Sequence, residues 1–126
     1  MAHRSGGRAL AQLIEEPFAK YLGNEYLAQG DDGALLPAPG AGKLVMATDC
    51  HVVSPLFFPG GDMGCLSVHG TINDVAMMGA QPLWLAAGFI LEEGFKLADL
   101  ARIVQSMAAA AKEAGVPIVT GDTKVV

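Results

Sequence analysis

The spacing of hydrophobic positions predicts helices near both ends of the chain. Apolar residues recur every three to four positions over residues 10–22 and, most clearly, over residues 97–114, where they form one continuous face. We expect Pro17 to break or kink the first helix, because proline lacks the backbone donor and clashes with the preceding turn. Gly115 is expected to end the second helix. The glycine-rich residues 1–8 predict a flexible start.

Strands are predicted between and after these helices. Residues 44–53 alternate in polarity and predict the best-defined strand, and residues 34–37 predict a short one. The run 82–91 is apolar throughout, which indicates a strand covered by helices on one side and by a second layer or a partner subunit on the other. Residues 116–120 predict a last strand, followed directly by a turn at 121–124. The order of elements indicates an α/β domain.

The central helix is predicted to begin at Asp62, an N-cap residue, and to end at Gly79. Asn73 and Asp74 lie side by side in this mostly apolar helix. Burying an unpaired carboxylate costs several kcal/mol, roughly, so Asp74 should face a partner, a metal or water. Gly70 lies one turn earlier and is expected to leave open space beside that carboxylate. A capped core helix whose aspartate binds a backbone donor is the simpler alternative.

Composition narrows the class of protein. The 126 residues suffice for one domain, and 52% are hydrophobic while 17% are charged, which suits a compact fold with extensive buried or interface surface. A net charge of -5 argues against nucleic acid or an anionic membrane as partner, although a nucleotide could still bind together with magnesium. No apolar run approaches the roughly 18 residues that cross a bilayer. We expect a soluble, cytoplasmic protein.

Four acidic residues share one setting, beside glycine, threonine or asparagine at predicted strand ends or on the central helix: Asp32, Asp49, Asp74 and Asp122. Carboxylates that converge repel one another unless a cation holds them. Mg²⁺ suits such oxygens, because it takes one or two carboxylates together with water and substrate phosphates. Each aspartate alone is more often a turn cap, and periodicity cannot bring the four into one site.

Other motifs carry less chemistry. Residues 40–43 resemble the end of a phosphate-binding P-loop, but the required first glycine and final Ser or Thr are missing, so we expect no Walker loop. Cys50 and Cys65 form no CxxC pair and are interpreted as reduced thiols that act as small hydrophobic groups. His69 is interpreted as a hydrogen-bonded helix residue and not as a proton carrier.

Five stretches together resemble the N-terminal half of the HypE family, the hydrogenase expression/formation proteins that are ATP-dependent carbamoyl dehydratases. They cover nearly the whole chain: Thr48-Asp49 and residues 53–62, 69–80, 88–95 and 121–126. The wider superfamily includes aminoimidazole ribonucleotide synthetase, selenophosphate synthetase and thiamine-phosphate kinase. Its shared signals, an early aspartate turn and an N-D-x-A-x-x-G-A helix, match Asp32 and residues 73–80.

The resemblance implies that residues 1–126 form a PurM-like N-terminal domain, a mixed sheet with helices on one face. Its sheet would pair with that of a second subunit across a twofold axis to form a barrel, with ATP and Mg²⁺ bound near the interface. Four residues would be metal or phosphate-site ligands: Asp32, Asp49, Asp74 and Asp122. Four would contact the nucleotide: Thr48, Asn73, Thr123 and Lys124.

The resemblance also implies a reaction for the whole protein. ATP would phosphorylate the amide oxygen of a thiocarboxamide on a C-terminal cysteine, and loss of phosphate would leave the thiocyanate that supplies cyanide to the iron of nickel–iron hydrogenases. A carbamoyltransferase and an iron-scaffold protein would be partners. These residues contain neither the family's second domain nor its cysteine tail, so no catalytic residue is assigned. We expect this chain alone to dimerise, to bind ATP–Mg weakly or not at all, and to lack dehydration activity.

Several positions depart from the family pattern. Arg4 replaces a usual glycine, Cys50 and His51 stand where a small residue and an aromatic are usual, and Cys65 stands where Ser or Lys is frequent. We expect none of them to touch the presumed carboxylates, although His51 could alter the adjacent pocket. Two alternatives stay open: an ATP-dependent kinase or synthetase of the same superfamily, and a non-catalytic dimerisation module.

Overall fold

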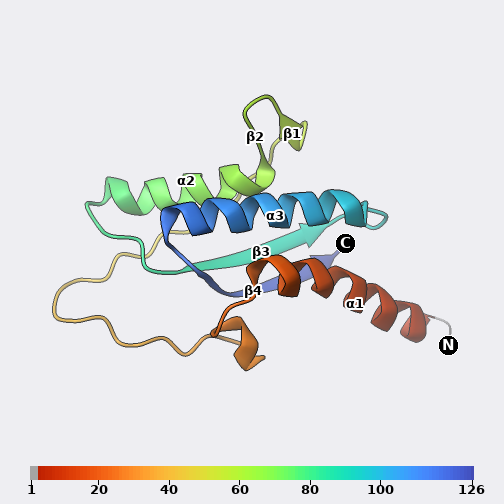
Figure 1. The fold of residues 1–126 in the computed structure, drawn as a ribbon, viewed down its shortest axis with the longest axis horizontal. Coiled ribbons are helices and arrows are strands. Elements are labelled where there is room, and N and C mark those ends of the chain that lie inside the picture. Colours follow the sequence, from red (N-terminus) through yellow and green to blue (C-terminus); the bar gives the residue numbers. More distant parts are fainter. Residues whose placement is uncertain (1–2) are drawn as a thin grey trace.

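The computed structural model describes residues 3–126, with side chains from residue 11 onward. Three long helices and four strands follow one another along the chain (Figure 1). In order they are α1 (His3–Leu22), the 3₁₀ turn η1 (Leu27–Gln29), β1 (Phe57–Phe58), β2 (Gly61–Asp62), α2 (Met63–Met77), β3 (Leu85–Leu91), α3 (Leu97–Ala114) and β4 (Ile118–Val125). The expected α/β class is confirmed.

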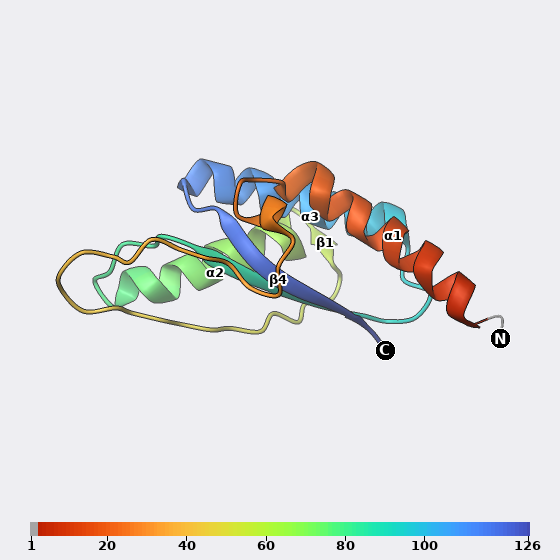
Figure 2. The ribbon, with the colours of Figure 1, turned by 90° about the horizontal axis from the view of Figure 1, so that it is seen from below.

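The three helices lie on one face of the parallel pair β3–β4, with α3 between α1 and α2 (Figures 1 and 2). Leu100 and Val104 of α3 are the largest fully buried side chains in the described part of the chain. They pack with Ile14 of α1, and Phe89 of β3 closes this cluster from the sheet side. A second cluster joins α2, α3 and the strands around Val68. The expected placement of helices on one face is therefore confirmed.

The helix α2 begins and ends as its sequence predicts. The Asp62 carboxylate accepts from the backbone N–H of Cys65 at 3.0 Å, and the Cys65 thiol accepts from the Asp62 N–H at 3.3 Å, so the two residues form a capping box. At the other end Gly79 has φ +73°, its N–H donates to Ala76, and the N–H of Ala80 donates to Val75. This pair of bonds is a Schellman motif, which satisfies two otherwise open carbonyls.

The first helix differs from its prediction in two ways. α1 continues through Pro17, although a break was expected there. Pro17 is buried beside Ile14 and Phe18, which pack on α3, and this packing offsets the roughly 3 kcal/mol that an internal proline costs. α1 also begins at His3, so the expected flexible start is wrong for residues 3–8, whereas residues 1 and 2 lie outside the described part.

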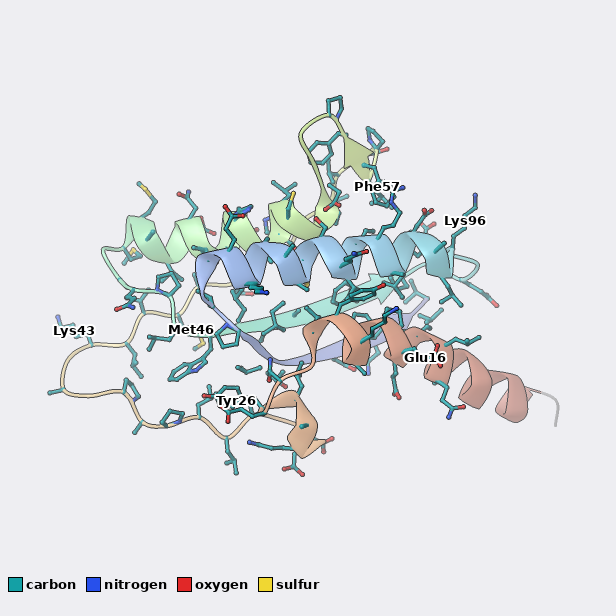
Figure 3. All side chains as sticks on the ribbon, viewed as in Figure 1. Glu16, Tyr26, Lys43, Met46, Phe57 and Lys96 are labelled. Carbon is teal, nitrogen blue, oxygen red and sulfur yellow. The ribbon has the colours of Figure 1, made fainter. Side chains whose placement is uncertain are left out.

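The strands predicted over 34–37 and 44–53 are not formed. Both segments belong to one long extended segment between η1 and β1, residues 31–56, which we call the arm. The arm leaves the helices, turns near Lys43 and returns toward α2 (Figure 3). A strand requires a hydrogen-bonded neighbour, and among the described residues no other strand pairs with the arm. Side-chain exposure along the arm still alternates with a period of two, because Val45 and Ala47 are half-buried while Met46 between them is 94% exposed.

The sheet is smaller than expected for the same reason. The described strands form two separate pairs, the antiparallel hairpin β1–β2 and the parallel pair β3–β4, and not one mixed sheet. The helices cover one face of β3 as expected, because Phe89 and Leu91 pack under them. On the other face Ile90 is 78% exposed within this chain, so its cover by a partner subunit stays a prediction. Residues 121–124 belong to β4 and do not form the predicted turn, because backbone pairing with β3 continues to Val125.

The hairpin β1–β2 stands at the N-terminal end of α2 (Figure 1). The guanidinium carbon of Arg102 lies 3.9 Å from the centre of the Phe57 ring, a cation–π contact that ties the hairpin to α3. The hairpin therefore packs against the domain. None of the helices described has the length and apolar character needed to cross a membrane.

Gly64 allows α2 to approach α3 closely. A methyl group at this position would collide with the carbonyl oxygen of Ile103 and lie 3.0 Å from the amide nitrogen of Met107. We predict that Gly64→Ala lowers the free energy of unfolding by about 1–3 kcal/mol, because the helices must separate. This cost exceeds the roughly 1 kcal/mol that alanine gains over glycine in a helix.

Urea denaturation would measure the effect of Gly64→Ala. Gly40→Ala is the matched control, because a methyl group at Gly40 meets nothing within 4 Å. Equal stability of the two variants would contradict the inferred contact.

Candidate nucleotide and metal site

Asp49 and His51 lie on the same side of the extended arm, as residues two apart in an extended chain do. The Nε2 atom of His51 is 3.4 Å from Oδ2 of Asp49, a polar contact in the ion-pair range. Oδ1 of Asp49 accepts from the N–H of Cys50 at 2.7 Å. The carboxylate is 45% exposed and the imidazole 14% exposed, so the acid stays open to a ligand while the ring is largely covered.

The arm reaches α2 at Gly70. A methyl group at Gly70 would lie 2.6 Å from Nε2 of His51, so the missing side chain makes room for the imidazole. The expectation of open space at Gly70 is therefore wrong, because His51 fills it. Asp74 lies one turn after Gly70 on the same face of α2, and its side chain is exposed. Because side chains in a helix lean toward its N-terminus, the Asp74 carboxylate is directed toward the contact between His51 and Gly70.

Asp122 and Lys124 lie on the face of β4 that points away from the helices. Asp122 pairs in register with Gly88 of β3, and Lys124 with the exposed Ile90. The Lys124 ammonium donates to Oδ2 of Asp122 at 2.8 Å, and the N–H of Thr123 donates to Oδ1 at 2.9 Å. The hydrogen bond from Lys124, followed by that from Thr123, holds the pKa of Asp122 below its usual value.

The other predicted site residues are distributed over the arm and α2. Asp32 lies in a bend at the start of the arm, Thr48 lies within the arm, and Asn73 lies on α2, all exposed. Among the side chains of residues 11–126, no three His, Cys, Asp or Glu residues lie close enough together to hold a metal ion. The structure thus links Asp49 to α2 through the contact of His51 with Gly70, one turn before Asp74, but it does not assemble the four aspartates into one cage.

The donor set nevertheless fits a magnesium–nucleotide complex. Mg²⁺ takes one or two carboxylates, and phosphates and water complete its shell. Asp49 and Asp122 are exposed, and each accepts a backbone N–H that orients its carboxylate. A groove of about 320 Å³ lies elsewhere, between the C-terminal ends of α1 and α3 near Pro117, and its lining contains no carboxylate and none of the predicted site residues. The candidate ligands therefore lie outside this groove, on the arm, α2 and β4.

His51 is the residue that the sequence did not assign to the site. Its departure from the family pattern was visible, and so was its spacing of two from Asp49, which places both side chains on one side of an extended segment. Its contact with Gly70 was not visible, because only the fold brings the arm against α2.

Comparison with known families defines the class of protein. Residues 30–126 match the model of the AIR synthase related protein, N-terminal domain. The chain therefore belongs to the AIR synthase related protein family, and it represents the N-terminal domain.

Within this class the chain is similar to HypE proteins. It is 73% identical to carbamoyl dehydratase HypE of Azotobacter vinelandii over 126 residues, which are all of this chain and 37% of that protein. A crystal structure of HypE in complex with ATP matches with a TM-score of 0.88 and 55% identity, over 97% of this chain and 36% of that one. A HypE–HypF complex matches with a TM-score of 0.66 and 59% identity, over 90% of this chain and 36% of that one.

These comparisons confirm the resemblance read from the sequence motifs. The chain spans a little over a third of the length of these relatives. The activity, substrates and partners of the whole protein are therefore matters of proposal.

The Asp122–Lys124 contact predicts a shift that can be measured. Lys124→Met removes the main stabiliser of the ionised carboxylate, so the pKa of Asp122 should rise toward its usual value while the Thr123 bond still holds it partly down. Because the folded-state pKa is lowered, any stability from this contact is present above the unfolded pKa and lost as pH falls through the folded one. An NMR titration of the Asp122 carboxyl carbon would measure the change. Lys112→Met should leave it unmoved, and an equal shift in both variants would argue against the contact.

Proposed function

We propose that this chain is the N-terminal, nucleotide-binding domain of an ATP-dependent carbamoyl dehydratase of the HypE type, acting in hydrogenase maturation. The observation that carries the proposal is the match to HypE in complex with ATP, which extends over 97% of this chain at 55% identity. At that identity both the fold and the local motifs of the two proteins correspond. The exposed carboxylates at the arm and α2 supply the oxygen ligands that a magnesium–ATP complex requires.

The proposal assigns the carboxylates to the cation. Asp49 contacts His51, which packs at Gly70 of α2, and Asp74 lies one turn further along the same helix. These two carboxylates would bind the cation, and Asp32 and Asp122 would supply ligands from the start of the arm and from β4. Bound Mg²⁺ would neutralise phosphate charge and favour transfer of the terminal phosphoryl group. Metal and phosphates would complete a set of ligands that the described chain alone leaves apart.

The remaining assigned residues would contact the nucleotide. Thr48 and Thr123 would donate hydroxyl hydrogen bonds to phosphate oxygens, and Asn73 would orient the nucleotide or the substrate through its amide. Lys124 would add positive charge at the phosphates. Its ammonium is bound to Asp122 here, so in this role it would exchange a carboxylate for a phosphate.

The reaction proposed for the whole protein is the dehydration of a thiocarboxamide on a C-terminal cysteine. The amide oxygen attacks the terminal phosphorus of ATP and ADP leaves. The oxygen then departs as inorganic phosphate as the nitrogen loses its protons and forms the nitrile. The net change removes one water from the amide and hydrolyses one ATP. The thiocyanate would supply cyanide to the iron of a nickel–iron hydrogenase, and residues 1–126 alone are not expected to catalyse this reaction.

We further propose that the protein works as a cytoplasmic homodimer beside a carbamoyltransferase and an iron-scaffold protein. The HypE–HypF complex supports a maturation partner of this kind. Exposed apolar side chains support the dimer. On the arm, Met46 and Val52 are 94% and 97% exposed, and on β3, Ile90 is 78% exposed. Such a surface is typical of an interface. In the proposed PurM-like arrangement, the arm and the β3–β4 pair would join those of a second subunit in a barrel.

Two alternatives are distinguishable. A kinase or synthetase of the same superfamily would bind ATP–Mg²⁺ equally but would not consume thiocarboxamide. A non-catalytic dimerisation module is favoured by the same exposed apolar surface, and it would not bind the nucleotide at all.

Calorimetric titration of ATP into the full-length protein, with and without Mg²⁺, tests the nucleotide site. We predict Mg²⁺-dependent binding that falls about 10- to 100-fold in Asp74→Asn, because a charged ligand is lost while the helix is kept. Glu113→Gln, which neutralises an exposed carboxylate at the far end of α3, is the matched control and should bind normally. Absence of ATP binding would favour the module, and ATP binding that changes neither with Mg²⁺ nor in Asp74→Asn would contradict the assigned metal site.

Light scattering at micromolar concentration tests the dimer. The wild type should have the mass of two chains, and Ile90→Lys should halve it, because a charge on the exposed face of β3 would have to be buried in the interface. Leu13→Lys on the outer side of α1 is the control and should remain dimeric. A wild type with the mass of one chain would rule out the proposed assembly.

A further inference from the structure

We propose that His51 is a positioning residue that clamps Asp49 against α2 and so sets the distance between the Asp49 and Asp74 carboxylates. The inference rests on the proposed nucleotide site and deepens it. His51 itself does not contact the metal or the nucleotide in this scheme. It acts through Asp49, and its seat on α2 exists because residue 70 is glycine.

The first observation in support is the position of the His51 ring against Gly70 of α2. The arm has no strand partner among the described residues, so side-chain contacts alone fix its register against α2. His51 is 14% exposed on an arm whose neighbouring Val52 is 97% exposed. Nε2 would lie 2.6 Å from a methyl group at position 70, closer than real contacts allow, so any side chain there must push the ring away.

The second support is the orientation of the carboxylate. Nε2 faces Oδ2 of Asp49 at 3.4 Å, while the N–H of Cys50 binds Oδ1 at 2.7 Å. Both oxygens of the carboxylate thus have a partner, while 45% of the side chain stays exposed to a ligand. Groups that orient a ligating carboxylate commonly matter for metal affinity almost as much as the ligand itself.

The third support is the relation to Asp74. Gly70 and Asp74 are four residues apart on one face of α2, so the seat of His51 and the second carboxylate share that face. A shift of the ring at Gly70 would move Asp49 relative to Asp74. The clamp therefore links the Asp49 segment of the arm to the face of α2 that carries Asp74.

A matched pair of substitutions tests the clamp in the full-length protein. Gln and Met have similar length and volume, but only Gln keeps an N–H that can face Asp49. We expect His51→Met to weaken Mg²⁺-dependent ATP binding about 10-fold or more, and His51→Gln to restore most of it, with equal melting temperatures. Gly70→Ala should weaken binding as His51→Met does, and the double variant should lose no more than either, because both remove one contact.

A spectroscopic measurement separates the clamp from the nucleotide site. The ring ¹⁵N signals of His51, assigned by their loss in His51→Gln, should shift in Asp49→Asn and in Gly70→Ala but not in Gly40→Ala. Ring signals that ignore Asp49→Asn overturn the clamp, whatever the binding data show. Equal affinity of the Met and Gln variants overturns it as well. A wild type without Mg²⁺-dependent ATP binding overturns the proposed function, and the ring signals then decide the clamp separately.

Discussion

The packing of α3 between α1 and α2 is the contact on which the rest of the structure depends. Val104 is fully buried, and Gly64 lets the backbones of α2 and α3 approach to a distance that no side chain would allow. Because protein interiors are close-packed, helices in such contact have little freedom to move relative to each other. The face of α2 that carries Gly70 and Asp74 is therefore fixed by contacts made on another face of the same helix.

The long arm follows a different rule. Its alternating side chains have the pattern of a strand, yet its backbone pairs with no described strand, and apolar side chains such as Met46 and Val52 are almost fully exposed. Extended backbone with open donors and acceptors is a template for pairing with another chain. The outer face of β3 likewise exposes an apolar side chain, that of Ile90. The two features have one explanation if both belong to a surface between subunits.

The chemistry of the candidate site is arranged by short-range contacts. Asp49 is oriented by the N–H of Cys50 and by His51, and Asp122 by Thr123 and Lys124. Each set involves residues one or two positions apart, so local geometry prepares the carboxylates before any ligand binds. Local contacts do not bring the four aspartates together, because these residues lie on the arm, α2 and β4. Attraction to bound magnesium, whose shell the phosphates would complete, would be needed to draw them together.

The sequence alone determined the features that depend on neighbours in the chain. The ends of α2 and α3 follow from Asp62, Gly79 and Gly115, because caps act over one turn, and the family follows from long local motifs. Tertiary structure decided the rest. It kept α1 helical through Pro17, extended β4 through residues 121–124, and left 44–53 without a strand partner, because packing and pairing depend on what lies across the gap. The seat of His51 at Gly70 belongs to this second group, since a glycine reveals what approaches it only after the chain has folded.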